Sequence, residues 1–312
     1  MMNEADTTSR TRGFTTLFLI EMWERFGYYG MTAVVVLFMV QQLGYTDDRA
    51  SLTFGAFAAL AYTVPAIGGW IGDKILGSRR TMVLGALILA LGYIGLSIPN
   101  HPGLLFPALG LVAVGGGIFK ANPANMISKL YEGDRAKLDS AFTMYYMAVN
   151  IGATASQLAT PLIALKVGWH AAFAVCAGGL VVGIINYFAM SRYLRHVGSA
   201  PDFQPLNVQR LVMVLVGIAI GVGLVTYIIQ NRTVARVIAA AQSVSIFEDL
   251  GMQQSQHSTL SSYLDKLLWL LVGSFGKRGG MGIHTDVVPI TRADAVDRFF
   301  SPVLGARIKV GA

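Results

Sequence analysis

Long apolar stretches without Asp, Glu, Lys or Arg alternate with short charged loops over most of the first 195 residues. A helix that crosses the hydrocarbon core of a bilayer needs about 20 predominantly apolar residues. Six segments fit this requirement. Pro99 to Pro102 divides the long run 81–119 into two of them, and the other four are residues 26–46, 50–72, 140–165 and 167–191. The first segment follows a charged but otherwise apolar start at residue 14. The pattern therefore predicts six membrane-spanning helices.

A seventh apolar run, residues 211–231, follows a polar linker. Beyond Gln242 acidic and basic residues are mixed, and the longest strongly apolar piece, residues 267–275, is too short to cross a bilayer. We therefore predict three parts. They are a six-span bundle over residues 1–195, a linker with an extra hydrophobic helix over residues 196–242, and an unassigned tail, of frame-shifted or fused origin, over residues 243–312.

Composition agrees with lipid as the natural surroundings of the chain. Hydrophobic residues make up 54% of the 312 residues, charged residues only 13%, and the mean hydropathy is +0.56; a soluble domain with this balance lacks polar surface. The net charge of +7 does not indicate a nucleic-acid partner, because the basic residues lie between apolar runs rather than on one face. The single cysteine, Cys176, excludes a disulfide or Cys-based metal site built from this chain alone, so we expect no metal and no bound cofactor.

The distribution of Lys and Arg predicts the orientation of the spans. If the N-terminus is cytoplasmic, ten basic residues lie in inner loops or ends and only Arg49 and Lys166 lie in outer ones, as the positive-inside rule requires. The seventh run fits this rule poorly, because a crossing would place Arg232 and Arg236 outside. The expected location is a multi-pass protein of the cytoplasmic (inner) membrane, with the N-terminus in the cytoplasm.

Three charged residues interrupt the first span. Glu21 and Arg25 are four residues apart and can pair on one helix face, while Glu24 shares a face with Tyr28. Ionisable groups inside a span are costly and are functional candidates by default. Two carboxylates beside a fixed cation form a site that can take up a proton and change which anion the cation holds. The alternative is that these residues mark the interfacial end of the helix, with Arg25 extended to the lipid headgroups.

Two further polar residues fall within predicted spans. Lys120 lies about two turns from the inner end of the fourth span, which we expect Pro123 to kink. Lys120 is either a substrate anchor or a residue whose long side chain extends its ammonium group to the cytoplasmic surface. Asn150 in the fifth span alone indicates little more than a hydrogen bond to a neighbouring helix.

Four motifs in this order resemble the proton-dependent oligopeptide transporter family of the major facilitator superfamily. The first is Glu-x-x-Glu-Arg-Phe-x-Tyr-Tyr-Gly over Glu21–Gly30, and the second is the charged loop Gly69–Arg80. The third is Phe119–Pro123, and the fourth is Phe-x-x-Tyr-Tyr-Met-x-Val-Asn-Ile-Gly-Ala over Phe142–Ala153. The resemblance covers about 230 residues and fades near Gln242.

The resemblance implies an all-α integral membrane fold: a six-helix N-terminal major-facilitator bundle made of two inverted three-helix repeats, one extra hydrophobic helix, and no C-terminal bundle. It implies proton-coupled symport of di- and tripeptides, with protons as the coupling ion. Membrane lipid surrounds the chain, and a second bundle or another copy is the implied protein partner. The implied roles are proton coupling for Glu21 and Glu24, substrate binding for Arg25, Lys120, Tyr28, Tyr29, Tyr62 and Asn150, and gating for Asp73, Arg79 and Arg80.

Several alternatives stay open on the sequence alone. Thr32 departs from the Arg found there in many relatives, which puts one cationic contact and part of the substrate preference in doubt. Nitrate or amino acids could replace peptides as substrates. The alternative function is a non-transporting membrane fragment or partner-binding remnant; an enzyme has no supporting nucleophile motif or His and Asp cluster. We expect Arg25 and Lys120 to face lipid or water where a second bundle should cover them, and the chain alone not to transport peptides.

Overall fold

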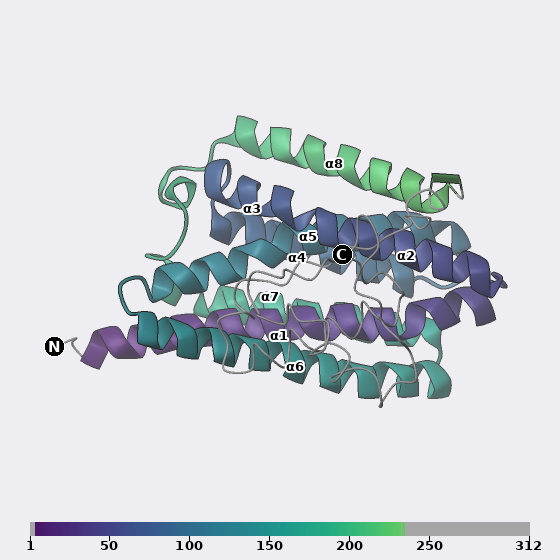
Figure 1. Ribbon diagram of the computed structural model, residues 1–312, viewed down its shortest axis with the longest axis horizontal. Helices are drawn as coiled ribbons and strands as arrows, with labels where there is room; N and C mark the ends of the chain where they lie inside the picture. Colours follow the sequence, from purple (N-terminus) through teal and green to yellow (C-terminus); the bar gives the residue numbers. More distant parts are fainter. Residues whose placement is uncertain (1–3, 232, 235–312) are drawn as a thin grey trace, which may run out of the picture. The chain divides into compact units, whose positions relative to one another are not determined.

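The computed structural model describes residues 4–231 and 233–234, all within the first of two units into which the chain divides, Met1–Ala239. The predicted tail over residues 243–312 lies outside the described residues. The helices, drawn in Figure 1, are α1 (Glu4–Gln41), α2 (Asp47–Thr63), α3 (Pro65–Lys74), α4 (Ser78–Ser97), α5 (Leu105–Leu130), α6 (Arg135–Lys166), α7 (Trp169–Met190) and α8 (Val208–Gln230), with short 3-10 turns at Pro102–Leu104, Ser191–Leu194 and Ala200–Phe203.

These elements are the predicted six spans and the extra helix. The described residues contain six segments long and apolar enough to cross a membrane, and they correspond to α2 with α3, α4, α5, α6, α7 and α8. These six segments include the extra helix α8 but not α1, the first predicted span. Helix α1 has 38 residues, and Glu21, Glu24 and Arg25 interrupt its apolar part. The chain is thus a multi-pass membrane protein, and the regular elements of its described residues are all helices.

The second predicted span, residues 50–72, consists of two helices rather than one. Pro65 is the first residue of α3, and Val64 joins it to α2 while still donating its backbone N–H to the Leu60 carbonyl. Proline is tolerated at the start of a helix because the N–H that it lacks has no partner there. The two helices still form one continuous segment, Asp47–Lys74, that is long enough to cross a bilayer.

Polar side chains and glycines fix where the spans begin. Thr46 accepts the backbone N–H of Arg49 and Asn207 accepts that of Arg210, so they cap α2 and α8. Because Thr46 caps the start of α2, it does not belong to the first span. That span, α1, ends at Gln41 rather than at the predicted residue 46. Asp134 caps α6 in the same way, and the backbone N–H of Lys137 lowers the pKa of the Asp134 carboxyl. Gly77 (φ 99°) makes the turn before α4 in a conformation that favours glycine.

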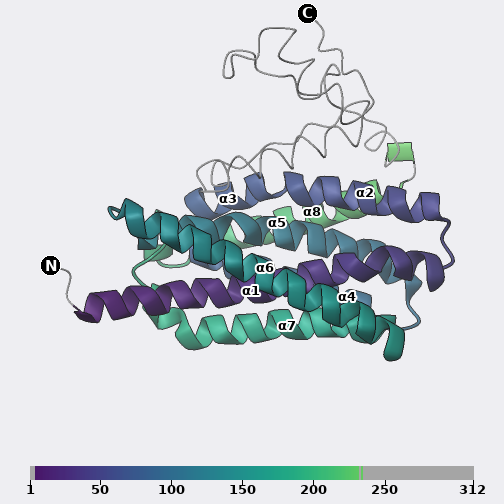
Figure 2. The same cartoon turned by 60° about the horizontal axis from the view of Figure 1, so that its bottom comes forward.

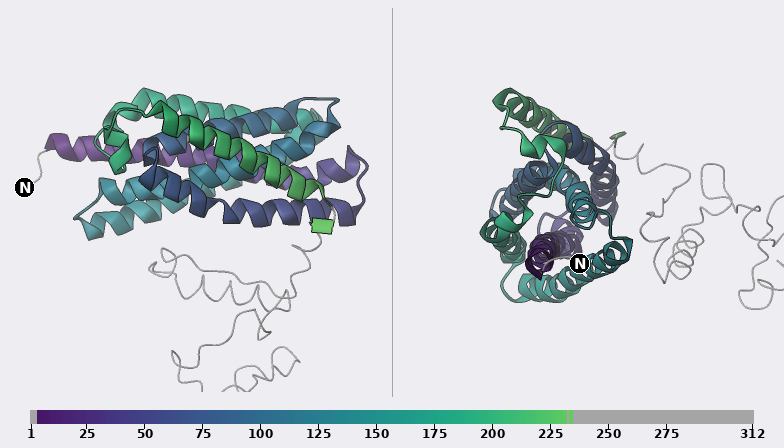
Figure 3. Two further views of the ribbon diagram at one scale, coloured as in Figure 1. Left: turned by 90° about the horizontal axis from the view of Figure 1, so that it is seen from above. Right: turned by 90° about the vertical axis from the view of Figure 1, so that its left-hand side faces the viewer.

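Helix α1 is flanked by α6 and α7, which run alongside it in Figures 1 and 2. Helix α4 packs on α5 and α7, whereas α8 packs on α5 and α2; Figure 3 shows the bundle along the helices in its right-hand view. Glycines bring α4 and α5 close together, since a Cβ on Gly85 would lie 2.6 Å from the Phe119 nitrogen. Such close helix contacts between small residues are typical of membrane bundles.

Candidate functional site

The three charged residues of α1 form a buried cluster in the middle of the bundle. The Arg25 Nε lies 2.9 Å from Glu21 Oε1 and 2.7 Å from Glu24 Oε2. The exposed fractions are only 2% for Glu21, 1% for Glu24 and 6% for Arg25. The predicted i,i+4 pair is confirmed, and Glu24 joins it as a second carboxylate on the same guanidinium.

This burial contradicts two expectations for Arg25. The side chain neither extends to the headgroups nor faces lipid or water, because α6 covers this part of α1. Gly152 of α6 makes the approach possible: a Cβ there would collide with the Met22 carbonyl oxygen and lie 3.2 Å from the Arg25 Cβ. The glycine of the fourth motif, Gly152, thus allows α6 to pack closely against α1 at the charge cluster.

The two tyrosines of the first motif adjoin the cluster. The Tyr28 and Tyr29 rings meet edge to face, with centroids 5.6 Å apart, and the Arg25 guanidinium carbon lies 5.8 Å from the Tyr28 ring centroid. Both tyrosines are partly exposed. They therefore form one wall between the buried charges and the surface. Thr32 donates its hydroxyl to the Tyr29 carbonyl 3.1 Å away.

Lys120 and Tyr62 form a second group on neighbouring helices. The Lys120 Nζ lies 4.6 Å from the Tyr62 ring centroid, within the range of a cation–π interaction. Helix α5 continues past Lys120 and Pro123 to Leu130, as predicted. Lys120 also interacts electrostatically with Glu24, which links the two groups. Tyr62 is 69% exposed and Asn150 of α6 is exposed as well, so both lie at the surface of this bundle.

Asp73 lies at the end of α3 and binds polar groups of two other segments. Its Oδ1 accepts hydrogen bonds from Asn125 Nδ2 at 2.7 Å and from the Ser199 hydroxyl at 3.0 Å. Ser199 in turn accepts a hydrogen bond from Lys129 Nζ at 2.8 Å. Asp73 therefore connects α3 to α5 and to the linker that follows α7.

Arg79 and Arg80 bind the same linker but not Asp73, to which neither makes an ion pair in the described structure. The Arg79 guanidinium donates to the carbonyls of residues 194, 195 and 202 and lies 3.7 Å from Asp202 Oδ1. Asp202 also accepts the backbone N–H of Arg79, so it occupies the N-terminus of α4, where a negative charge is favourable. The acidic and basic residues of the charged loop thus have different partners.

Sequence reasoning assigned no role to Asp202, Tyr93 and Tyr145, which lie around these sites; Tyr145 of α6 is buried and interacts with Glu21. Asp202 gave no signal for Arg79, which is more than 100 positions away in the sequence; its local partner is the backbone N–H of Ser199, in a capping box. Tyr93 is fully buried in α4, and its ring lies against Gly27, one turn beyond Glu24. It stands in an apolar run where an aromatic residue predicts only packing. Cys176 is buried, and the described residues contain no group of three His, Cys, Asp or Glu that could hold a metal.

Comparison with known proteins gives consistent matches. A family model described as PTR2, the POT family, matches residues 79–272. The chain is 44% identical over 236 residues to "Dipeptide and tripeptide permease A" of Edwardsiella piscicida, which covers 75% of this chain and 48% of that protein. The family match extends to residue 272, beyond Gln242, near which the resemblance was expected to fade.

Solved structures agree with the sequence matches. The structure described as tetrameric PepTSo2 superimposes with a TM-score of 0.71 at 50% identity and covers 75% of this chain and 52% of that one. A structure described under substrate recognition in proton dependent oligopeptide transporters gives a TM-score of 0.68, also at 50% identity, over 74% of this chain and 52% of that one. The chain spans about half the length of the relatives it matches.

Proposed function

The chain belongs to the POT family, and we propose that its bundle provides the proton-coupling and carboxylate-binding half of a symporter for di- and tripeptides. The observation that carries the proposal is the burial of Arg25 between Glu21 and Glu24, with Lys120 within electrostatic range. Ionisable groups buried in a membrane bundle mark substrate and proton pathways.

Charge balance supplies the coupling. When all four side chains are ionised, the two carboxylates of Glu21 and Glu24 offset the two cations of Arg25 and Lys120. A peptide carboxylate that binds Lys120 or Arg25 adds one negative charge beside the buried cluster, where uncompensated charge is costly. The ammonium of the zwitterionic peptide lies, in this proposal, at the exposed Asn150 and does not offset that charge. Uptake of a proton by Glu21 or Glu24 restores neutrality, so peptide and proton bind together.

The remaining site residues have supporting roles in this proposal. Tyr28, Tyr29 and Tyr62 shape the wall of the site, and Asn150 contacts the backbone or amino end of the peptide. Asp73, Arg79 and Arg80 act at the gate, with the linker after α7 as their partner. Alternating access needs a second bundle opposite this one, supplied by another polypeptide segment or by another copy.

We also propose that the N-terminus and the loop at Gly77 are cytoplasmic. The proposal rests on the excess of Lys and Arg in the loops on that side. It places Asp73, Arg79 and Arg80 at the cytoplasmic end of the bundle, in the inner membrane.

Dipeptide binding to the purified 312-residue chain tests the proposed function. We expect weak, saturable binding of an alanine dipeptide that the C-terminal amide of the same dipeptide does not reproduce, because the amide lacks the carboxylate. Lys120→Gln should weaken binding about tenfold, the size of one lost charge-assisted hydrogen bond. Lys137→Gln, at an exposed position, is the matched control. Equal binding of the amide and the free acid would contradict the proposed site.

A further inference from the structure

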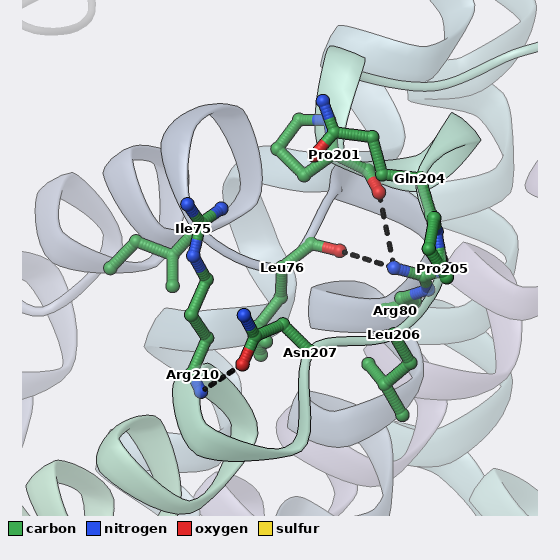
Figure 4. A pocket seen from close by; sticks show the side chains of 9 residues that line it. All are labelled: Ile75, Leu76, Arg80, Pro201, Gln204, Pro205, Leu206, Asn207 and Arg210. Atoms are coloured by element: carbon green, nitrogen blue, oxygen red, sulfur yellow. Dashed lines mark hydrogen bonds between the residues drawn. The ribbon is translucent and has the colours of Figure 1, made fainter.

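A cavity of about 350 Å³ lies at one end of the bundle, away from the charges of α1. It is bordered by the residues between α3 and α4 and by the residues that lead into α8 (Figure 4). Three membrane-spanning segments, Asp47–Lys74, Ser78–Ser97 and Val208–Gln230, end or begin at this place. The cavity therefore lies where the hydrocarbon core meets the polar headgroups.

The lining of the cavity is apolar except for two arginines and the polar residues of the linker. Ile75, Leu76 and Leu206 supply apolar surface, and Arg80 and Arg210 supply the charge. In Figure 4 Arg210 extends alongside Ile75, and Arg80 lies on the other side of Leu76. Outside the cavity the exposed apolar face of α8, which includes Val208, continues the apolar surface toward the membrane.

Neither arginine forms an ion pair with a carboxylate of the described residues. Arg80 donates to three carbonyl oxygens, those of residues 76, 201 and 204, which fix the guanidinium without neutralising it. A guanidinium has five N–H donors, so two remain available on Arg80. The Asp202 carboxylate nearby is paired with Arg79 instead. The Arg80 guanidinium thus keeps its positive charge while its carbonyl partners hold it in a fixed position.

We propose that this cavity binds the headgroup of an anionic phospholipid. The phosphate would lie between Arg80 and Arg210, whose planar forks match the geometry of phosphate oxygens. The acyl chains would follow Leu206 and the exposed face of α8. Basic pockets between membrane helices on the cytoplasmic side have the chemistry that anionic headgroups require. The site shares Arg80 with the proposed gate, but lipid binding there requires neither peptide nor proton.

The test measures lipid binding to the purified full-length chain by native mass spectrometry. Phosphatidylglycerol and phosphatidylcholine with identical acyl chains are added, and the affinity of each is determined. We expect phosphatidylglycerol to bind more tightly, and Arg210→Gln to reduce its affinity about tenfold. Arg210 is exposed, and its hydrogen bond to Asn207 is made by the backbone N–H rather than by the side chain, so this variant should fold normally.

Two controls distinguish a lipid site at this cavity from general attraction between charges and from a site for free phosphate. Arg135→Gln removes the same charge from another exposed position and should leave phosphatidylglycerol affinity unchanged. Inorganic phosphate at millimolar concentration should not displace the lipid, since it lacks the acyl chains. Equal affinity for the two lipids, an equal loss in Arg135→Gln, or displacement by inorganic phosphate would each overturn the proposal.

Discussion

The guanidinium of Arg25 is the group on which the stability of the charge cluster depends. Its removal in Arg25→Met leaves Glu21 and Glu24 buried without a cation, and breaking a buried ion pair on one side costs about 3–5 kcal/mol. We expect a loss of that size in the free energy of unfolding, measured by denaturant titration in detergent. Glu24→Gln added to Arg25→Met should recover part of the loss, because it removes one of the two unpaired charges.

The control for this prediction is Arg135→Met, at an exposed position of α6. Its effect should stay within about 0.5 kcal/mol, as for other surface substitutions. A loss in Arg25→Met no larger than in Arg135→Met would show that the cluster is hydrated rather than buried.

At the scale of elements, Gly152 sets the distance between α1 and α6. In Gly152→Ala the new methyl group meets the Met22 carbonyl oxygen, so the two helices must separate and stability should fall by about 1–3 kcal/mol. Gly178→Ala in α7 is the matched control, since nothing lies within 4 Å of its added Cβ. The measurement is the midpoint of thermal unfolding in the same detergent. Equal midpoints for the two variants would contradict the close α1–α6 contact.

The spans were predictable from the sequence because their signals are local. Apolar length, capping residues such as Asp134 and the break at Pro99 to Pro102 act within one or two helical turns. The Glu21–Arg25 pair was predictable for the same reason, since both residues lie on one helix. The split of the second span at Pro65 was missed because the spans were counted as stretches without charged residues, although a proline inside a helical pattern is itself a local signal of a break.

The surroundings of these residues were not predictable, since they depend on how helices pack. The cover over Arg25 comes from Gly152, more than 100 positions away, and nothing near Arg25 in the sequence indicates it. The linker partner of Arg79 is Asp202, which stands in a polar segment where a carboxylate is ordinarily solvated. Lys120 was a candidate from the sequence alone, because it lies inside a predicted span, whereas Tyr62 could be assigned only through the family resemblance. The structure places the two residues in contact.

At the scale of the whole molecule, the orientation in the membrane can be tested with two single cysteines. Gly103→Cys is in the predicted outer loop and Glu132→Cys in the predicted inner loop, and both positions are exposed. An impermeant thiol reagent added to intact cells should label the first at once and the second only after permeabilisation. The native Cys176 is buried and should stay unlabelled. The opposite labelling pattern would reverse the proposed topology.

Peptide and proton should bind together at the buried charges. Titration calorimetry of an alanine dipeptide into the purified chain, in buffers of different ionisation enthalpy, counts the protons that accompany binding. Charge balance predicts the uptake of about one proton per dipeptide near neutral pH, and no uptake in Glu24→Gln. Dipeptide binding without proton uptake in the unaltered chain, or undiminished uptake in Glu24→Gln, would contradict the proposed coupling.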